Sequence, residues 1–77
     1  MGKNAIIASR LNDLLEVMDA RTPVNIFVED KDGRRTRIAF IKVYEFLSSP
    51  VLMKKYKDCV VVGLSCGLAT NILIKEA

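Results

Sequence analysis

An Asp-Gly pair, Asp32-Gly33, constrains the fold more than any other feature of the sequence. It lies between two runs in which polar and apolar residues alternate, residues 24–28 and residues 34–40. An Asp-Gly pair in this position is a strong hairpin signal, because glycine readily takes the positive φ that tight turns between strands need. The sequence therefore predicts two antiparallel strands joined by the turn 29–33, and thus a fold that contains a β-sheet.

The second strand of this hairpin is expected to have a basic side and an apolar side. Two arginines alternate with less polar residues, in the order Arg35, Thr36, Arg37, Ile38 and, two positions later, Phe40. Successive side chains of a strand point to opposite faces of the sheet. We therefore expect both arginines on one face, and Thr36, Ile38 and Phe40 turned inward.

The N-terminal segment has the spacing of an amphipathic helix. Its apolar residues fall at offsets of 0, 4, 7, 8 and 11 and are Ile7, Leu11, Leu14, Leu15 and Met18. This period predicts a helix with one apolar stripe. Two starts fit the sequence: Asn4 as the cap of a longer helix, or Ser9 as the cap of a shorter one after a brief extended piece. The helix should end before Pro23, which favours an extended conformation at Thr22.

Two short helices are expected after the first hairpin. Residues 41–47 are ambiguous, since their apolar positions suit either a longer strand or a short helix from about Lys42, which we favour. Ser49 and Pro50 then have the pattern of a helix start, with serine as the cap and proline in the first helical position. This second helix should run to about Tyr56.

The C-terminal part of the chain predicts a second hairpin. Residues 59–64 form a β-prone run, and a further apolar stretch ends at residues 72–74. With the first hairpin, this order predicts an α+β fold with a four-stranded antiparallel sheet, made of two hairpins, and helices packed on one face. A chain of 77 residues is expected to form a single domain, residues 1–77.

The composition is that of a globular protein, with 51% hydrophobic and 27% charged residues. No stretch reaches the roughly 20 consecutive apolar residues of a membrane-spanning helix. The first eight residues are too short for the apolar part of a secretory signal. We therefore expect a cytoplasmic protein without a membrane partner. Self-association as a homodimer is a further expectation, because so small a chain with this much apolar material does not readily hide all of it.

The residues of common catalytic and metal sites are missing. The chain has no histidine, which excludes Ser/His and Cys/His nucleophile pairs and removes the commonest metal ligand. Cys59 and Cys66 are too few for a zinc site and are expected as free thiols. The acidic residues Glu29, Asp30 and Asp32 lack the spacing of a calcium loop and are interpreted as a solvated turn. We expect no enzyme, and no metal or other cofactor.

Positive charge is concentrated in one part of the chain. Residues 31–42 hold five basic residues and one acidic residue, a balance of +4, whereas the whole chain has a net charge of +3. Such a basic strand attracts phosphate, which makes nucleic acid or a nucleotide a candidate ligand. Lysines of the following helix could join the strand, and the candidate binding residues are then Lys31, Arg34, Arg35, Arg37, Lys42, Lys54 and Lys55. The alternative is a solvated face that resists aggregation, because Phe27 is the only ring expected beside these charges.

The segment Leu11–Val28, with the sequence LNDLLEVMDARTPVNIFV, resembles the opening of small uncharacterised α+β proteins of phages and prophages of Gram-positive bacteria. In those proteins an LLEVLD helix precedes a Thr-Pro-Val turn and a strand. The matching residues here are Leu14, Leu15, Val17, Asp19, Thr22, Pro23 and Val24. The resemblance transfers no catalytic residue. It implies a mobile-element setting, in which small proteins often bind other proteins, including components of host defence.

The sequence leads to two hypotheses about function. The first is a non-enzymatic binding module of mobile-element type, which acts by protein–protein interaction through a sheet edge or an exposed helix face and also self-associates. The alternative is nucleic-acid or nucleotide binding through the basic strand 34–42. No motif specifies the protein partner of the first hypothesis.

Overall fold

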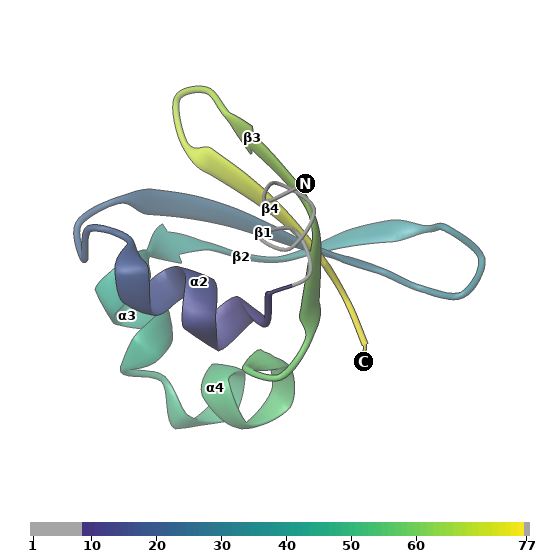
Figure 1. Ribbon diagram of the computed structural model, residues 1–77, viewed down its shortest axis with the longest axis horizontal. Helices are drawn as coiled ribbons and strands as arrows, with labels where there is room; N and C mark the ends of the chain where they lie inside the picture. The colour runs from purple at the N-terminus through teal and green to yellow at the C-terminus, as the bar shows by residue number, and fades with distance from the viewer. Residues whose placement is uncertain (1–8, 77) are drawn as a thin grey trace.

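The computed structural model describes residues 9–76, which form three helices and four strands. In chain order these are α2 (Leu11–Val17), β1 (Pro23–Glu29), β2 (Arg35–Lys42), α3 (Val43–Leu47), α4 (Pro50–Tyr56), β3 (Val60–Cys66) and β4 (Thr70–Lys75). The four strands form one sheet, and the helices lie below it in Figure 1. The α+β class and the four-stranded sheet expected from the sequence are confirmed.

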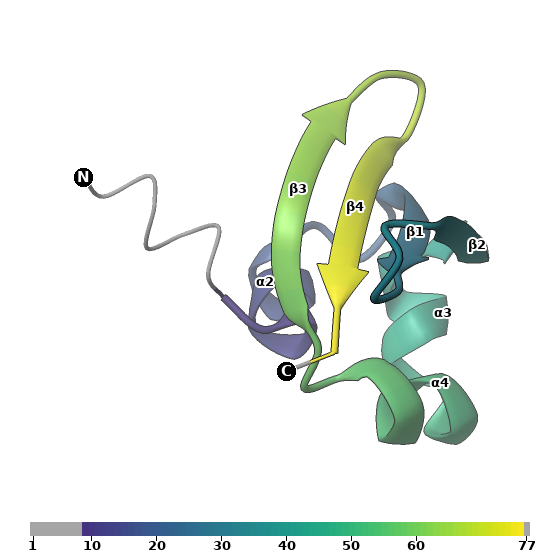
Figure 2. The ribbon, with the colours of Figure 1, turned by 90° about the vertical axis from the view of Figure 1, so that its right-hand side faces the viewer.

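The sheet is mixed, so the prediction of a fully antiparallel sheet is wrong. Its strand order is β2-β1-β4-β3. Both hairpins form as antiparallel pairs, but β1 and β4 are neighbours that run parallel to each other. Figure 2 shows β4 between β3 and β1. Parallel neighbours need a long crossover, and here the connection from β1 to β4 consists of β2, the helices α3 and α4, and β3.

The choice of central strands follows from their side chains. Val24 and Ile26 of β1, and Ile72 and Ile74 of β4, have no exposed surface. An antiparallel sheet in chain order would have placed the arginine-bearing β2 in the centre instead. In the observed order the two strands with the most buried side chains are central, and β2 lies at an edge, where charged side chains also discourage aggregation.

The hydrophobic core lies between the sheet and the helices. Leu11 and Leu15 of α2 are fully buried in it, four residues apart on one side of the helix. Burying one such side chain stabilises a fold by about 1.5–3 kcal/mol. The buried core residues are Leu11, Leu15, Val24, Ile26, Val43, Phe46, Cys59, Val61, Ile72 and Ile74.

Helix α2 has the shorter of the two predicted forms. It begins at Leu11, and its N-terminal neighbour Arg10 makes no side-chain cap hydrogen bond. Ser9, expected as the cap, belongs instead to a short extended piece that lies against β3. The extended piece explains the late start, because backbone that pairs with a strand is not free to join the helix. Asn4 and Ile7, named in the prediction for the longer helix, lie outside the described residues.

The two later helices begin close to the predicted positions. Strand β2 continues to Lys42, and α3 follows it directly. The Ser49 Oγ accepts a hydrogen bond of 3.3 Å from the Leu52 backbone N–H, with Pro50 in the first turn, so the predicted start of α4 is confirmed. None of the helices within residues 9–76 is long and apolar enough to cross a membrane.

Candidate functional site

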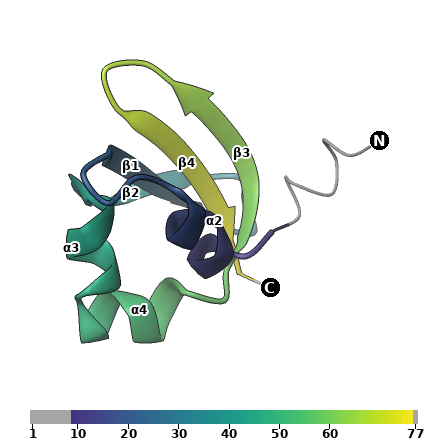
Figure 3. The same cartoon turned by 60° about the vertical axis from the view of Figure 1, so that its left-hand side comes forward.

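The sheet has a second face over which no helix of the described chain lies (Figure 3). The strand registers define which side chains point to this side, because paired residues share a face. We call it the open face. Its residues are Pro23, Asn25, Phe27 and Glu29 of β1, Arg35, Arg37, Phe40 and Lys42 of β2, Val60, Gly63 and Ser65 of β3, and Asn71, Leu73 and Lys75 of β4.

A β-bulge brings Phe40 to the open face. Ile26 pairs with Ala39 and Phe27 pairs with Arg37, so Ile38 is the extra residue on β2. Both Ile38 and Ala39 pack against the core, and the alternation therefore shifts by one position after them. Phe40 is 59% exposed, on the same face as the arginines. The prediction that Phe40 turns inward is wrong for this reason. Thr36 pairs with Val28 and so lies on the inner side of the sheet as predicted, although it is exposed near the hairpin turn. Ile38 packs against the core.

The two arginines of β2 lie on the same face and make different contacts. Arg35 pairs with Glu29 across the strands, with 3.6 Å between Nε and Oε2, and its side chain is 63% exposed. An ion pair this exposed contributes little to stability. Arg37 lies over the Phe40 ring, with 5.8 Å from the guanidinium carbon to the ring centroid. The open face therefore presents a cation and an aromatic ring together.

A row of polar side chains crosses the open face from β1 to β3. The Asn25 Nδ2 donates to the Asn71 Oδ1 at 3.2 Å, and the Asn71 Nδ2 donates to the Ser65 Oγ at 3.4 Å. The Asn25 Oδ1 is buried and has no hydrogen-bond partner among residues 9–76. Buried acceptors are normally paired, so this end of the row, opposite Phe40, is short of one donor.

A shallow groove of about 610 Å³ lies beside this polar row. Its walls include Phe27 and Arg35 on one side and Leu73 in the middle. Gly63 has no side chain to fill the groove, and a Cβ at this position would stand only 3.3 Å from the Leu73 Cβ, which is a tight contact. The groove therefore offers an apolar floor with a ring and a cation at its rim. The full lining consists of Phe27, Arg35, Val62, Gly63, Leu64, Ser65, Asn71, Ile72 and Leu73.

The candidate binding residues named from the sequence fall into three separate places. Arg35, Arg37 and Lys42 belong to the open face. Lys31 and Arg34 lie in the exposed turn between β1 and β2. Lys54 and Lys55 lie in the last turn of α4, within the helix layer on the other side of the sheet (Figure 1). The expectation that these lysines join the arginine strand is therefore wrong, because the sheet separates them.

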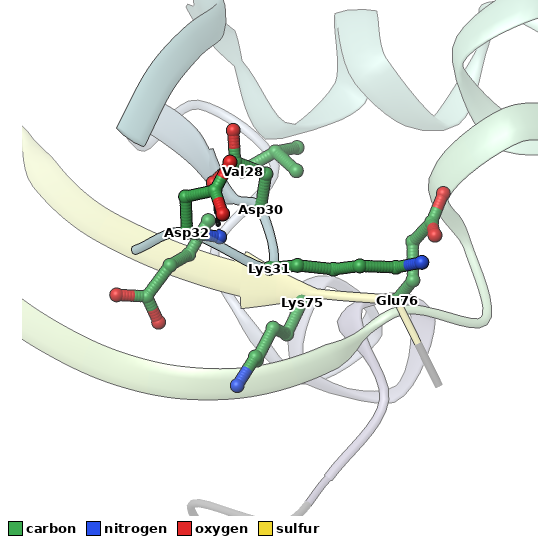
Figure 4. Close-up of a pocket in the computed structure, with 7 residues that line it drawn as sticks. Val28, Asp30, Lys31, Asp32, Lys75 and Glu76 are labelled. Carbon is green, nitrogen blue, oxygen red and sulfur yellow. Dashed lines mark hydrogen bonds between the residues drawn. The ribbon is translucent and has the colours of Figure 1, made fainter. Parts of the chain in front are cut away.

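The hairpin turn forms a second concave region of about 540 Å³ (Figure 4). Acidic and basic side chains mix there, and Lys31 extends across it toward Glu76. The Asp30 Oδ1 already accepts hydrogen bonds of 2.9 Å from the backbone N–H groups of Asp32 and Arg34. Gly33 has φ +82°, the positive value that the Asp-Gly pattern predicted. Within residues 9–76, no group of three His, Cys, Asp or Glu side chains is arranged to hold a metal ion. This region is best explained as a turn.

The two cysteines are free thiols with different surroundings. Cys66 is exposed at the end of β3, and Cys59 is buried in the core. Burial raises the pKa of the Cys59 thiol, and the nearby carboxylates of Glu76 and Asp58 raise it further. A raised pKa keeps Cys59 as the neutral thiol, which is a poor nucleophile.

Several open-face residues were not identified from the sequence. Phe40 was assigned to the core, although the run 38–41 holds four consecutive apolar residues, which strict alternation cannot place on one face. That run was the available signal for a bulge. Asn25, Asn71 and Lys75 have no local signal, because their common position depends on the parallel pairing of β1 with β4.

The open face thus combines two aromatic rings, four basic side chains against the single carboxylate of Glu29, and a row of amides. These groups can stack on flat ligands, attract anions and form directional hydrogen bonds. Among the described residues of this face, none is arranged as a nucleophile with an adjacent base. Comparisons of the chain with protein-family models, with curated proteins and with solved structures found no match.

Proposed function

We propose that this protein is a non-enzymatic binding module that holds single-stranded nucleic acid on the open face of its sheet. The observation that carries the proposal is the position of Phe40, which stands beside Arg37 on the face that also holds Phe27. Proteins that bind single strands combine basic side chains, which attract the backbone phosphates, with aromatic rings, on which the bases stack. The open face has both kinds of group.

The two rings have a spacing that suits neighbouring bases. Phe27 pairs with Arg37, and Phe40 pairs with Asn25, so the rings are diagonal neighbours on adjacent strands. Diagonal neighbours on a sheet are about 7–8 Å apart. Each ring can therefore receive its own base, while the polar row from Asn25 to Ser65 lies within reach of the base edges.

A single strand fits this face better than a duplex does. The bases of a duplex are stacked inside the helix and cannot lie on aromatic side chains of a flat sheet. The basic side chains Arg35, Arg37 and Lys42 follow β2 along the edge, where the phosphates of a strand lying across the rings would pass. A free nucleotide can stack on only one of the two rings, so the affinity should increase with the length of the oligonucleotide.

Charge reversal at Arg37 tests the proposal with a matched control. Arg37→Glu removes a charge-assisted contact worth about 1.5–3 kcal/mol, which corresponds to about 10- to 150-fold weaker binding. It should also flatten the dependence of binding on salt by about 0.7 in logarithmic slope for each lost phosphate contact. Lys55→Glu is the control, because Lys55 stands over the Tyr56 ring at 5.5 Å but in the helix layer.

Fluorescence anisotropy with labelled oligothymidylate and oligouridylate measures both variants across a salt series. The proposal predicts weakened binding for Arg37→Glu and wild-type binding for Lys55→Glu. It is wrong if the wild-type protein binds neither single strand at low salt, or if both variants lose affinity equally. Tighter binding to duplexes of the same length would also contradict it.

The cellular setting belongs to the same proposal. A cytoplasmic location gives the protein access to nucleic acid, and a phage or prophage origin is supported by the resemblance of the segment Leu11–Val28 alone. A protein partner is the second candidate. The observation that favours it is the part of the outer edge of β3 beyond Val61, which has no strand beside it within residues 9–76.

A further inference from the structure

Strand β3 is the outermost strand on one side of the sheet, and part of its outer edge is unpaired within residues 9–76. Arg10 bridges to Val60, and the Ser9 carbonyl accepts a hydrogen bond of 2.8 Å from the Val61 N–H. Beyond this point β3 has only β4 as a described neighbour. An open edge presents backbone N–H and C=O groups that can pair with another strand. The stretch Gly63–Cys66 is such an edge.

The two edges of the sheet differ in charge. Strand β2 carries Arg35, Arg37 and Lys42 and has a bulge at Ile38, and these features oppose pairing with a second copy. Residues 59–74, which include β3, contain no charged side chain. The bulge at Val62 distorts only the start of β3. In a protein with a net charge of +3, the edge Gly63–Cys66 is therefore the one that an identical strand can approach without repulsion.

Exposed apolar side chains accompany this edge. Leu64 is 49% exposed on β3, and Leu68 in the following turn is fully exposed. The β3–β4 hairpin that carries them projects beyond the helices in Figure 1. Antiparallel pairing of two such hairpins would cover apolar surface together with the free backbone groups.

We propose that two copies of this chain pair through their Gly63–Cys66 edges in antiparallel orientation and form one continuous eight-stranded sheet. A two-fold axis perpendicular to the sheet relates the copies, as expected of a symmetric dimer. The contact is short and lies at the low end of protein interfaces, so the dimer forms in a concentration-dependent way. The pairing does not depend on nucleic-acid binding.

The dimer has a consequence that does rest on the proposed function. A two-fold axis perpendicular to the sheet places both open faces on the same side. One nucleic-acid strand can then contact both faces, and the second contact is strengthened by its high local concentration. A monomeric variant should therefore lose affinity for long oligonucleotides more than for short ones.

Sedimentation of the protein without nucleic acid tests the pairing. The wild-type chain of 8.6 kDa should shift toward twice that mass as its concentration rises. Leu64→Lys should remain monomeric, because it places like charges across the edge. Val51→Lys is the control: Val51 is 74% exposed but lies on α4. A monomeric wild type at all concentrations, or dimers of both variants alike, would overturn the proposal.

Hydrogen exchange distinguishes a second copy from other occupants of the edge. In the dimer, protection of backbone amides within Gly63–Cys66 should rise with protein concentration and vanish in Leu64→Lys. Protection that is the same at every dilution would place another segment of the same chain on this edge and refute the pairing. If circular dichroism shows that Leu64→Lys is unfolded, Ser65→Lys takes its place in both experiments. The same monomeric mass is expected for it.

Discussion

Replacing Phe40 with alanine separates base stacking from charge attraction. The Phe40 side chain is 59% exposed and lies under the Arg37 guanidinium on the open face. The change Phe40→Ala removes the ring but keeps every basic side chain of β2. If Phe40 only fills space on a solvated strand, binding to nucleic acid should not change.

The expected loss follows from the energy of stacking one base. A base stacked on an aromatic side chain contributes about 1–3 kcal/mol. Losing it weakens binding by about 5- to 150-fold, since 1.4 kcal/mol corresponds to a factor of ten. The cost to folding should be well below the ~3–5 kcal/mol of removing a buried phenylalanine, because Phe40 is outside the buried core. The variant should therefore remain folded in the binding assay.

Anisotropy titrations with a labelled single strand measure this loss directly. Tyr44→Ala is the matched control, because Tyr44 is also a half-exposed ring, at 48%, but lies on α3 in the helix layer. Phe40→Ala should bind more weakly with an unchanged salt dependence, and Tyr44→Ala should bind like the wild type. Wild-type affinity in Phe40→Ala, or an equal loss in Tyr44→Ala, would refute the stacking role.

Two further predictions concern the fold. Gly33→Ala should lower the free energy of unfolding by about 1–2 kcal/mol in urea titrations, because φ is +82° at this turn. Gly67→Ala should change it little, because φ is not positive there and a Cβ would stand 3.9 Å from the Ala69 carbonyl oxygen, an ordinary contact. Equal effects of the two changes would contradict the turn geometry. The raised pKa of Cys59 means that its neutral thiol favours the folded state. The contribution of this thiol to the free energy of unfolding is complete below pH 9.0, the ordinary pKa, and is lost as the pH rises through the higher pKa of the folded state. Cys59→Ala should therefore lose less stability at alkaline pH than the wild type. The same loss in both proteins would contradict this.

Local features of the fold were predictable from the sequence. Gly33 was expected at positive φ, and Ser49 with Pro50 was expected to start a helix, because these preferences act between residues close in the chain. The alternation of Val24 and Ile26 likewise identified the buried side of β1. Such features depend on backbone conformation and on a single strand or helix.

Long-range features were not predictable in the same way. The parallel pairing of β1 with β4 places Val24 beside Thr70, which is far away in the chain. The alternation of polar and apolar residues along a strand is the same whether its neighbour is parallel or antiparallel, so it does not predict this pairing. The side of the sheet on which Lys54 and Lys55 lie depends on how α4 packs, which their own charges do not determine. The candidate site was therefore only half predictable: its arginines were, but its second ring and its amides were not.

A titration of isotope-labelled protein with a short single-stranded oligonucleotide, followed by amide NMR shifts, tests the central claim most directly. We expect the largest shifts at Phe27, Arg37, Phe40 and Leu73 on the open face, with the amides of α4 unchanged. Shifts confined to α4, or no shifts at saturating oligonucleotide and low salt, would contradict the assignment of this face to nucleic acid.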